Sequence, residues 1–314
     1  MPKEIRYHVG TRGSRLALTQ ARLYLDTLKA KHPSLAFDLS IIQTSGDQFG
    51  QLSPEGVMVK SGKGIFVKEI EEALLEGRID LAIHSLKDLP GDLPQGLVLA
   101  GFQKRGDPRD VLVAKSGWEE LGQGARIGTS SLRRQVQLAE LAAKSNKTIE
   151  MVNLRGNLDT RVKKVESGDL DGVILSGAGL NRLGLSGRVS HFFDPVSQII
   201  PACGQGTLAA EIRSDRADLF EILSLAEDRQ TRLASELERR VLKTLGGGCL
   251  EAIGIYAEPV KVSSGDQELD LGSLALHLYR QADEAGQEPL RYDLLVSAEN
   301  VEAMMQRLAG LPRN

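Results

Sequence analysis

The chain has 314 residues, of which 41% are hydrophobic and 26% charged, and its formal net charge is −3. This composition predicts two or three folded domains, and it argues against broad non-specific nucleic-acid binding, which requires a basic surface. No stretch of about 18 apolar residues occurs and the N-terminus lacks a signal-peptide core, so we expect a cytoplasmic protein without membrane contact.

Two pairs of segments resemble each other along the first two thirds of the chain. VGTRGSRLALTQARLYLDTL (9–28) and IGTSSLRRQVQLAELAAK (127–144) each predict a short strand, a Gly-Thr turn, a Ser and an amphipathic helix. EGRIDLAIHS (76–85) matches SGDLDGVILS (167–176), in which a Ser ends an apolar strand. Because both pairs occur in the same order, we predict two related α/β domains with mainly parallel sheets and ligands beyond the strands' carboxyl ends.

The predicted fold class is α/β, with these two domains arranged around a cleft in the periplasmic-binding-protein-like manner. Residues 1–104 and 198–221 are predicted to form domain 1, because Pro and Gly in SQIIPACGQGTLAAEIR indicate that the chain crosses back there. Residues 105–197 form domain 2. Residues 222–314 predict an α+β domain 3, in which a long polar helix and a glycine run precede a small antiparallel sheet.

The chain has two cysteines, Cys203 and Cys249. A structural disulfide is not expected in the cytoplasm, and no Cys or His spacing predicts a metal site. Cys249 follows three glycines in LGGGCLEAIG, on the loop that joins the long helix to the sheet. It is either a reactive thiol or a buried structural one, and the second interpretation is kept for Cys203 in PACGQG.

Several cations occupy positions that favour an anion. Arg133 and Arg134 lie in the first turn of the helix that starts near Ser131, where the helix dipole disfavours positive charge, and Arg12 and Arg15 are placed similarly. An anion bound beside the backbone N–H groups would explain them, whereas the alternative is that they bend into solvent. Further cations near predicted turns indicate a focused polyanion site in the cleft: Lys60, Lys63, Lys87, Arg155, Arg161 and Arg182.

One carboxylate, Asp88 in IHSLKDLP, lies among these cations. It could stabilise a developing cation and transfer a proton, or it could cap the turn ahead of Pro90. His84 is expected to be a packed strand residue.

An ATP-binding interpretation of KSGKG does not fit. Five residues separate Gly56 from Gly62 where a phosphate-binding loop needs four, and Gly64 follows Lys63 in place of Ser or Thr.

Taken in order, the segments HSLKDLP, GTSSLRRQ, NLRGNLDTR, AGLNRLGL, PACGQG and GGGC closely resemble the porphobilinogen deaminase (hydroxymethylbilane synthase) family, over nearly the whole chain to about residue 256. The resemblance implies a transferase of porphyrin and heme biosynthesis that condenses four porphobilinogens head to tail, releasing ammonia each time. Hydrolysis then frees the linear tetrapyrrole hydroxymethylbilane. The resemblance further implies a monomer that hands its product to uroporphyrinogen-III synthase.

The family pattern assigns roles to individual residues. It implies that Cys249 carries a dipyrromethane primer through a thioether, and that Asp88 assists loss of ammonia, steadies the azafulvene cation and removes the surplus proton. Residues implied to bind this cofactor are Ser85, Lys87, Asp88, Thr129, Ser131, Arg133, Arg134, Arg155 and Gly156. Residues implied to bind substrate are Arg12, Ser14, Lys63, Arg155, Arg161, Arg182 and Gln205.

The chain departs from the family pattern at two places. VKSGKG is one residue shorter than the usual K-x-G-G-K-G, and Leu250, Glu251 and Ala252 replace the usual Gln-Val-Pro after the cysteine. Judged from the cations and the predicted cleft alone, a binding module that releases an anionic ligand unchanged is the rival function.

Overall fold

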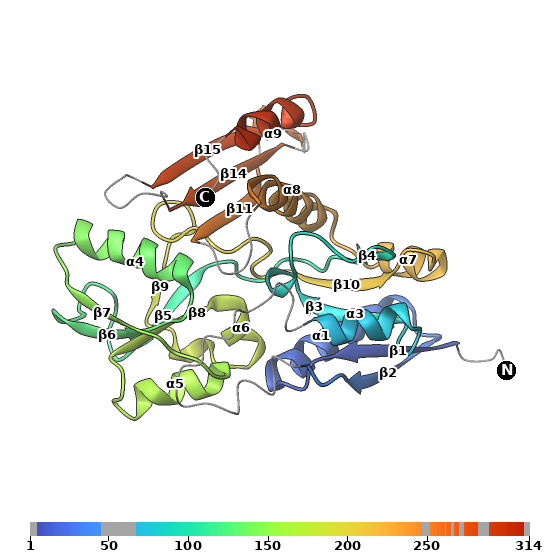
Figure 1. The fold of residues 1–314 in the computed structure, drawn as a ribbon, viewed down its shortest axis with the longest axis horizontal. Coiled ribbons are helices and arrows are strands. Elements are labelled where there is room, and N and C mark those ends of the chain that lie inside the picture. Colours follow the sequence, from blue (N-terminus) through green and yellow to red (C-terminus); the bar gives the residue numbers. More distant parts are fainter. Residues whose placement is uncertain are drawn as a thin grey trace.

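The computed structural model describes residues 5–44, 67–246, 252–260, 262–264, 267–269, 273–281 and 289–310. Of the predicted site residues, Lys63 and Cys249 lie outside the described residues, as do Lys60, Leu250 and Glu251. Figure 1 shows two sheets side by side in the lower part of the view and a third, smaller sheet above them.

The first sheet contains five described strands, of which four are parallel and β10 is antiparallel to its neighbours. In their order across the sheet they are β2 (Leu35–Ile41), β1 (Ile5–Thr11), β3 (Leu81–Ser85), β10 (Leu208–Arg213) and β4 (Leu97–Ala100). The helices packed on this sheet are α1 (Arg15–Lys31), α3 (Lys68–Leu75) and α7 (Ala217–Ser224).

The second sheet repeats this arrangement, with β5 as its antiparallel strand. Across it lie β7 (Ile149–Val152), β6 (Ala125–Gly128), β8 (Gly172–Ser176), β5 (Asp110–Ala114) and β9 (His191–Phe192). Its helices are α4 (Leu132–Lys144), α5 (Leu158–Glu166) and α6 (Gly177–Arg182), followed by the short 3₁₀ turn η2 (Ser186–Arg188).

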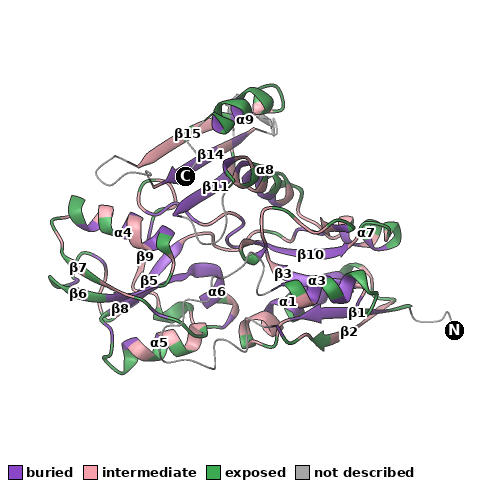
Figure 2. Ribbon diagram, viewed as in Figure 1, coloured by how far each residue is buried: buried purple, intermediate pink, exposed green. Residues whose placement is uncertain are grey.

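The predicted duplication is confirmed by this topology. The strand and helix of residues 9–28 correspond to β1 and α1, and those of residues 127–144 to β6 and α4. The strands that end at Ser85 and Ser176 are the central β3 and β8. In each half, apolar residues on alternate sides of the strands bury both faces of the sheet under helices, as expected for mainly parallel sheets. Figure 2 shows these strands as buried, whereas the outer helix faces are exposed.

The chain passes between the two sheets twice. It leaves the first sheet after Ala100 and enters the second at Asp110, then returns after Phe192 to form β10. The two crossing segments contact each other, because Gly106 N–H donates to the Gly206 carbonyl at 3.1 Å. Each sheet therefore receives its antiparallel strand through these adjoining segments, which makes the crossing region the structural link between the halves.

The C-terminal part forms the small antiparallel sheet that the sequence predicts. Its strands are β11 (Ile253–Pro259), β14 (Leu274–Arg280) and β15 (Leu290–Val296), beside a two-stranded ribbon of β12 (Val262–Ser264) and β13 (Gln267–Leu269). Apolar side chains of α8 (Arg229–Leu245) and α9 (Val301–Ala309) pack on this sheet, together with the half-buried Cys203. The fold-class prediction is thereby confirmed, and the three domain boundaries remain our proposal.

None of the helices within the described residues combines the length and apolar character that crossing a bilayer requires.

Candidate active site

The turn that carries Asp88 is fixed by apolar residues on either side of it. Strand β3 runs directly into one 3₁₀ turn, η1 (Leu86–Asp88). Leu86 and Leu89 are buried with Val67 and Phe102, and Leu86 N–H donates to the Thr207 carbonyl at 3.0 Å. Lys87 is half-buried and Asp88 is exposed between these anchors. A carboxylate on a fixed turn with an accessible side chain is suited to act on a bound molecule.

Arg133 and Arg134 lie in the first turn of α4, as predicted, but both side chains are buried. Their partner is Asp110, the first residue of β5. Asp110 accepts from Arg133 Nη1 at 2.6 Å, and from Arg134 Nε and Nη2 at 2.9 and 2.7 Å. One carboxylate therefore orients two guanidinium groups. Sequence reasoning missed Asp110, although a carboxylate opening the otherwise apolar strand DVLVA was a usable signal.

The charge state of this triad follows from its surroundings. Burial alone would raise the pKa of Asp110, but the charges of Arg133 and Arg134, with hydrogen bonds from Arg133 and Gln205, outweigh it and hold the pKa well below the usual range. Burial lowers the pKa of Arg133. Asp110 is thus ionised at neutral pH, and it compensates one of the two positive charges.

Gln205 connects this triad to the Asp88 turn. Its side-chain nitrogen donates to the Pro108 carbonyl at 2.7 Å and to Asp110 Oδ1 at 3.0 Å. Its side-chain oxygen accepts from Lys87 Nζ at 3.5 Å, a long contact. Burial and then the nearby Arg134 charge lower the pKa of Lys87 to about 8. Lys87 therefore lies within electrostatic reach of Arg134 and of the carboxylates of Asp88 and Asp110.

Two further predicted cations belong to the same cluster. Burial, and next the charge of Arg134, lower the pKa of Arg161 to about 10, and its Nε donates to the Gly156 carbonyl at 2.9 Å. Burial also lowers the pKa of Arg182 to about 10, and the opposing influence is the charge of Asp88. The structure thus brings together residues from both halves of the chain: Lys87, Asp88, Arg133, Arg134, Arg161, Arg182 and Gln205.

Other predicted residues have roles in the local backbone. Ser14 caps α1 by accepting from Ala17 N–H at 3.2 Å, and the hydroxyl of the buried Thr129 accepts from Ser131 N–H at 3.3 Å. Ser131 is the N-cap residue of α4 without a side-chain cap bond. Ser85 ends β3 half-buried, and Arg12 is half-buried after β1. Arg155 and Gly156 are exposed in the loop before α5, where Gly156 adopts φ +111°.

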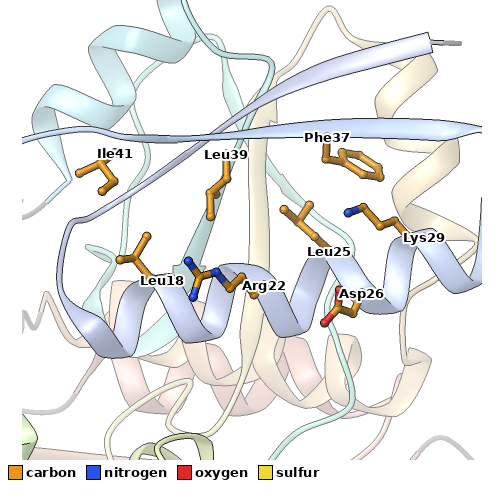
Figure 3. A pocket seen from close by; sticks show the side chains of 8 residues that line it. All are labelled: Leu18, Arg22, Leu25, Asp26, Lys29, Phe37, Leu39 and Ile41. Carbon is orange, nitrogen blue, oxygen red and sulfur yellow. The ribbon is translucent and has the colours of Figure 1, made fainter.

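A distinct groove of about 320 Å³ lies between α1 and β2. Figure 3 shows it lined by apolar side chains of both elements, with Arg22, Asp26 and Lys29 along the helix. None of the predicted site residues lines it, so it is separate from the cationic cluster.

Among the residues that the structure describes, no group of three or more His, Cys, Asp or Glu side chains could hold a metal ion. The donor set instead suits a carboxylate-bearing organic group. Within the described residues, Arg133 donates to Asp110 and to the Ile200 carbonyl through Nη1 alone. Its Nε and Nη2 edge can therefore donate two parallel hydrogen bonds to a carboxylate. This geometry fits an anionic cofactor such as the dipyrromethane that the sequence resemblance implies.

Two comparisons of the sequence with known proteins agree on one family. The family model described as "Porphobilinogen deaminase, dipyromethane cofactor binding domain" matches residues 7–221. A porphobilinogen deaminase from Syntrophus aciditrophicus is 46% identical over 253 residues, which cover 80% of each chain. One from Brevibacillus brevis is 47% identical over 254 residues with the same coverage. Among solved structures, a putative lipoprotein from Actinomyces odontolyticus has a TM-score of 0.43 and 15% identity, covering 79% of this chain and 98% of that chain.

Proposed function

Because this chain belongs to the porphobilinogen deaminase family, we propose that the cationic cluster binds the carboxylates of substrate and cofactor and that Asp88 is its catalytic residue. The enzyme is a transferase that condenses four porphobilinogen molecules, with loss of ammonia, into hydroxymethylbilane, and its cofactor is dipyrromethane.

The observation that carries the site assignment is the gathering of cations around the Asp88 turn. Arg133 and Arg134 are buried there, and Lys87, Arg161 and Arg182 are half-buried. Burial lowers the pKa of Lys87, Arg161 and Arg182, and an anion bound beside them would oppose that shift. Every pyrrole unit brings an acetate and a propionate. Carboxylates bound here would restore the favourable electrostatic interactions that these cations lose on burial. Each guanidinium group can bind a carboxylate through two parallel hydrogen bonds.

Asp88 is the group placed to handle positive charge on the substrate. Its exposed carboxylate lies near Lys87 and Arg182, as their electrostatic coupling indicates, so a substrate held by these cations through its carboxylates meets Asp88. A carboxylate Oδ there stabilises the cation left when ammonia departs and accepts the proton that the coupled pyrrole carbon must lose. A negative charge that is already fixed where positive charge develops accelerates the step, because the protein does not have to reorganise during the reaction.

The remaining residues would bind and orient. Asp110 holds Arg133 and Arg134 of the proposed cofactor set. The set as a whole consists of Ser85, Lys87, Asp88, Thr129, Ser131, Arg133, Arg134, Arg155 and Gly156, with Cys249 as the attachment point. Arg12, Ser14, Lys63, Arg155, Arg161, Arg182 and Gln205 form the proposed substrate set. When bound through Cys249, dipyrromethane supplies the pyrrole terminus from which the chain is extended.

The deciding experiment compares the intact mass of the purified protein with that of Cys249→Ala. We expect an adduct of two pyrrole units on the wild-type chain and none on the variant, with ammonia released from porphobilinogen only by the former. An unmodified wild-type chain that also gains no pyrrole on incubation with porphobilinogen would contradict the site assignment. It would favour the rival anion-binding module.

From the family resemblance we also propose a monomeric state, a cytoplasmic location and transfer of the product to uroporphyrinogen-III synthase. Light scattering of the primed enzyme tests the first. The transfer is tested by measuring how well increasing concentrations of the synthase compete with spontaneous cyclisation of the product.

A further inference from the structure

Helix α8 contacts both segments that cross between the first two sheets. At its N-cap, Asp228 N–H donates to the Phe102 carbonyl at 2.7 Å. In its third turn, the fully buried Glu238 accepts from Arg105 Nη1 and from Gly204 N–H, each at 2.6 Å. Figure 1 shows α8 between the C-terminal sheet and the first half of the molecule. The helix is therefore attached to the crossing region at two points nearly three turns apart.

The residue after Glu238 makes a contact of a different kind. Arg239 Nη2 donates to the carbonyl oxygens of both Pro90 and Gly91, at 3.0 and 3.1 Å. These carbonyls belong to the segment that leaves the η1 turn, two and three residues after Asp88. A single guanidinium nitrogen thus joins α8 to the backbone that carries the proposed catalytic carboxylate.

Two neighbouring features allow this contact. An added Cβ on Gly91 would lie 3.9 Å from Leu242 Cγ and Lys243 Cα, so the Gly91 backbone lies directly against the helix. Lys243 Nζ also pairs with Asp92 Oδ1 at 2.7 Å, but both side chains are about two-thirds exposed and the pair stabilises the contact little. Arg239, which is half-buried, is therefore the principal polar link between α8 and the segment after Asp88 among the described contacts.

The other end of the helix leads to the cofactor cysteine. Helix α8 ends at Leu245 and is closed by Gly246 in the left-handed conformation, with φ 72°, which glycine adopts without strain. Cys249 follows Gly246 by three residues in the sequence. Less than two turns of helix thus separate Arg239 from the last residue of α8, and a short peptide connects that residue to the proposed attachment point.

We infer that Arg239 is a positioning residue, which holds the Asp88 turn in a fixed relation to helix α8, whose last residue, Leu245, precedes Cys249 by four positions in the sequence. This inference rests on the proposed roles of Asp88 and Cys249. Coupling between two groups requires their reacting atoms to be held within a few tenths of an ångström, and a displacement of about 1 Å can cost a hundredfold in rate. A contact from α8 to the backbone after Asp88 supplies this constraint without touching substrate.

Arginine suits this role better than lysine or glutamine. Its planar guanidinium fixes the directions of the two Nη2 hydrogens toward the two carbonyls, whereas an ammonium rotates freely on a flexible stem and an amide side chain is shorter. The graded series Arg239, Arg239→Lys and Arg239→Gln therefore tests orientation separately from charge.

The experiment measures primer loading by intact mass, thermal unfolding, and kcat and KM for porphobilinogen in the primed fraction. We expect Arg239→Gln to load two pyrrole units and to lose at least about tenfold in kcat, with KM changed less than threefold. Arg239→Lys should lie between this variant and the wild type. Arg240→Gln is the matched control, because Arg240 is the next residue, is exposed and pairs only with Glu302 on α9 in the described structure.

Two outcomes would overturn the inference. One is a primed Arg239→Gln protein with wild-type kcat, and the other is a loss of kcat that Arg240→Gln reproduces. If Arg239→Gln does not fold, a wild-type kcat in primed Arg239→Lys has the same meaning. Failure of the proposed function is distinguishable, because it would appear as a wild-type chain without a pyrrole adduct, or as full activity of Cys249→Ala, before any Arg239 variant is compared.

Discussion

Replacing Asp110 by asparagine should separate the orientation of the arginine pair from the rest of the fold. The substitution keeps the shape of the side chain and removes its charge. Arg133 and Arg134, which are 4% and 7% exposed, then lie buried beside each other without their common anion. Asparagine can still accept a hydrogen bond from one of them, but its amide group meets the other as a second donor.

The expected cost follows from the burial of all three groups. Removing one partner of a buried ion pair costs about 3–5 kcal/mol, because the remaining charge loses its compensation. For a large domain, 1 kcal/mol corresponds to roughly 2–4 °C in Tm, so the expected decrease is on the order of 10 °C. Asp38→Asn is the control, because its ion pair with Arg6 at 2.8 Å is about half exposed and should change Tm by no more than about 2 °C.

The assay is thermal unfolding of Asp110→Asn with and without the pyrrole adduct, combined with intact mass. We expect lower Tm in the unprimed form and impaired primer loading, since the two guanidinium groups are no longer oriented. Added polycarboxylate should restore part of the lost Tm, because it supplies the missing anion. A decrease below about 2 °C with normal priming would refute the argument, since it would mean that Asp110 neither stabilises nor orients the pair.

The acid dependence of this substitution has a defined sign. The pKa of Asp110 is depressed in the folded state, so its contribution to stability is present above the ordinary carboxyl pKa of about 4 and is lost as pH falls toward the folded value. The difference in Tm between wild type and Asp110→Asn should therefore shrink as pH is lowered below about 4.

Three further predictions concern charged groups of the first half of the chain. Lys87, with a pKa of about 8, should react with an amine-selective reagent half-maximally near pH 8 in unprimed Cys249→Ala protein, and a value above 10 would contradict the burial argument. Asp88→Asn should fold and keep its pyrrole adduct but lose about 10²–10⁴-fold in kcat, and near-normal turnover would exclude the proposed role. Glu71 lies buried on α3, where burial and then the charge of Glu211 raise its pKa to about 7. Because the unfolded chain releases this proton near pH 4.5, the free energy of unfolding should fall by at most about 3 kcal/mol as pH rises to 7. Glu71→Gln should flatten the accompanying decline in Tm. The control, Glu72→Gln at the exposed neighbouring residue, should not.

The sequence predicted the parts of the fold that local patterns determine. The strand that ends at Ser85, the helix that begins after Ser131 and the order of elements in both halves follow from apolar periodicity and helix-capping residues, and the structure confirms them. His84 was expected to be a packed strand residue, and it is buried beside Glu211, with Nε2 and Oε2 at 3.0 Å. These features depend on residues close together in the chain.

Contacts between distant residues could not be read in the same way. The sequence predicts that Arg133 and Arg134 bind an anion, and the structure adds a protein carboxylate that contacts both from 23 and 24 residues away in the sequence. Nothing in a single sequence states that Asp110 begins the antiparallel strand next to β8. The same limit applies to Glu238, whose ion pair with Arg105 joins residues 133 positions apart.

Corresponding positions of the two halves carry different chemistry. Ser85 pairs with Leu208 in the first sheet, and Ser176 pairs with Asp110 at the corresponding place in the second. A leucine in one half therefore matches a buried carboxylate in the other.

The helices that follow show the complementary difference. When the N-cap residues Ser14 and Ser131 are aligned, the positions of Arg133 and Arg134 correspond to Leu16 and Ala17 in α1. The cations of the first half, Arg12 and Arg15, consequently do not repeat the pair in α4, although the motifs look alike in sequence. Leu208, Leu16 and Ala17 in the first half thus correspond to Asp110, Arg133 and Arg134 in the second. The second half therefore presents oriented cations, whereas the turn after β3 in the first half presents Asp88. A site that must bind many carboxylates and also stabilise a cation requires this asymmetry, because a carboxylate placed within the arginine pair is already neutralised.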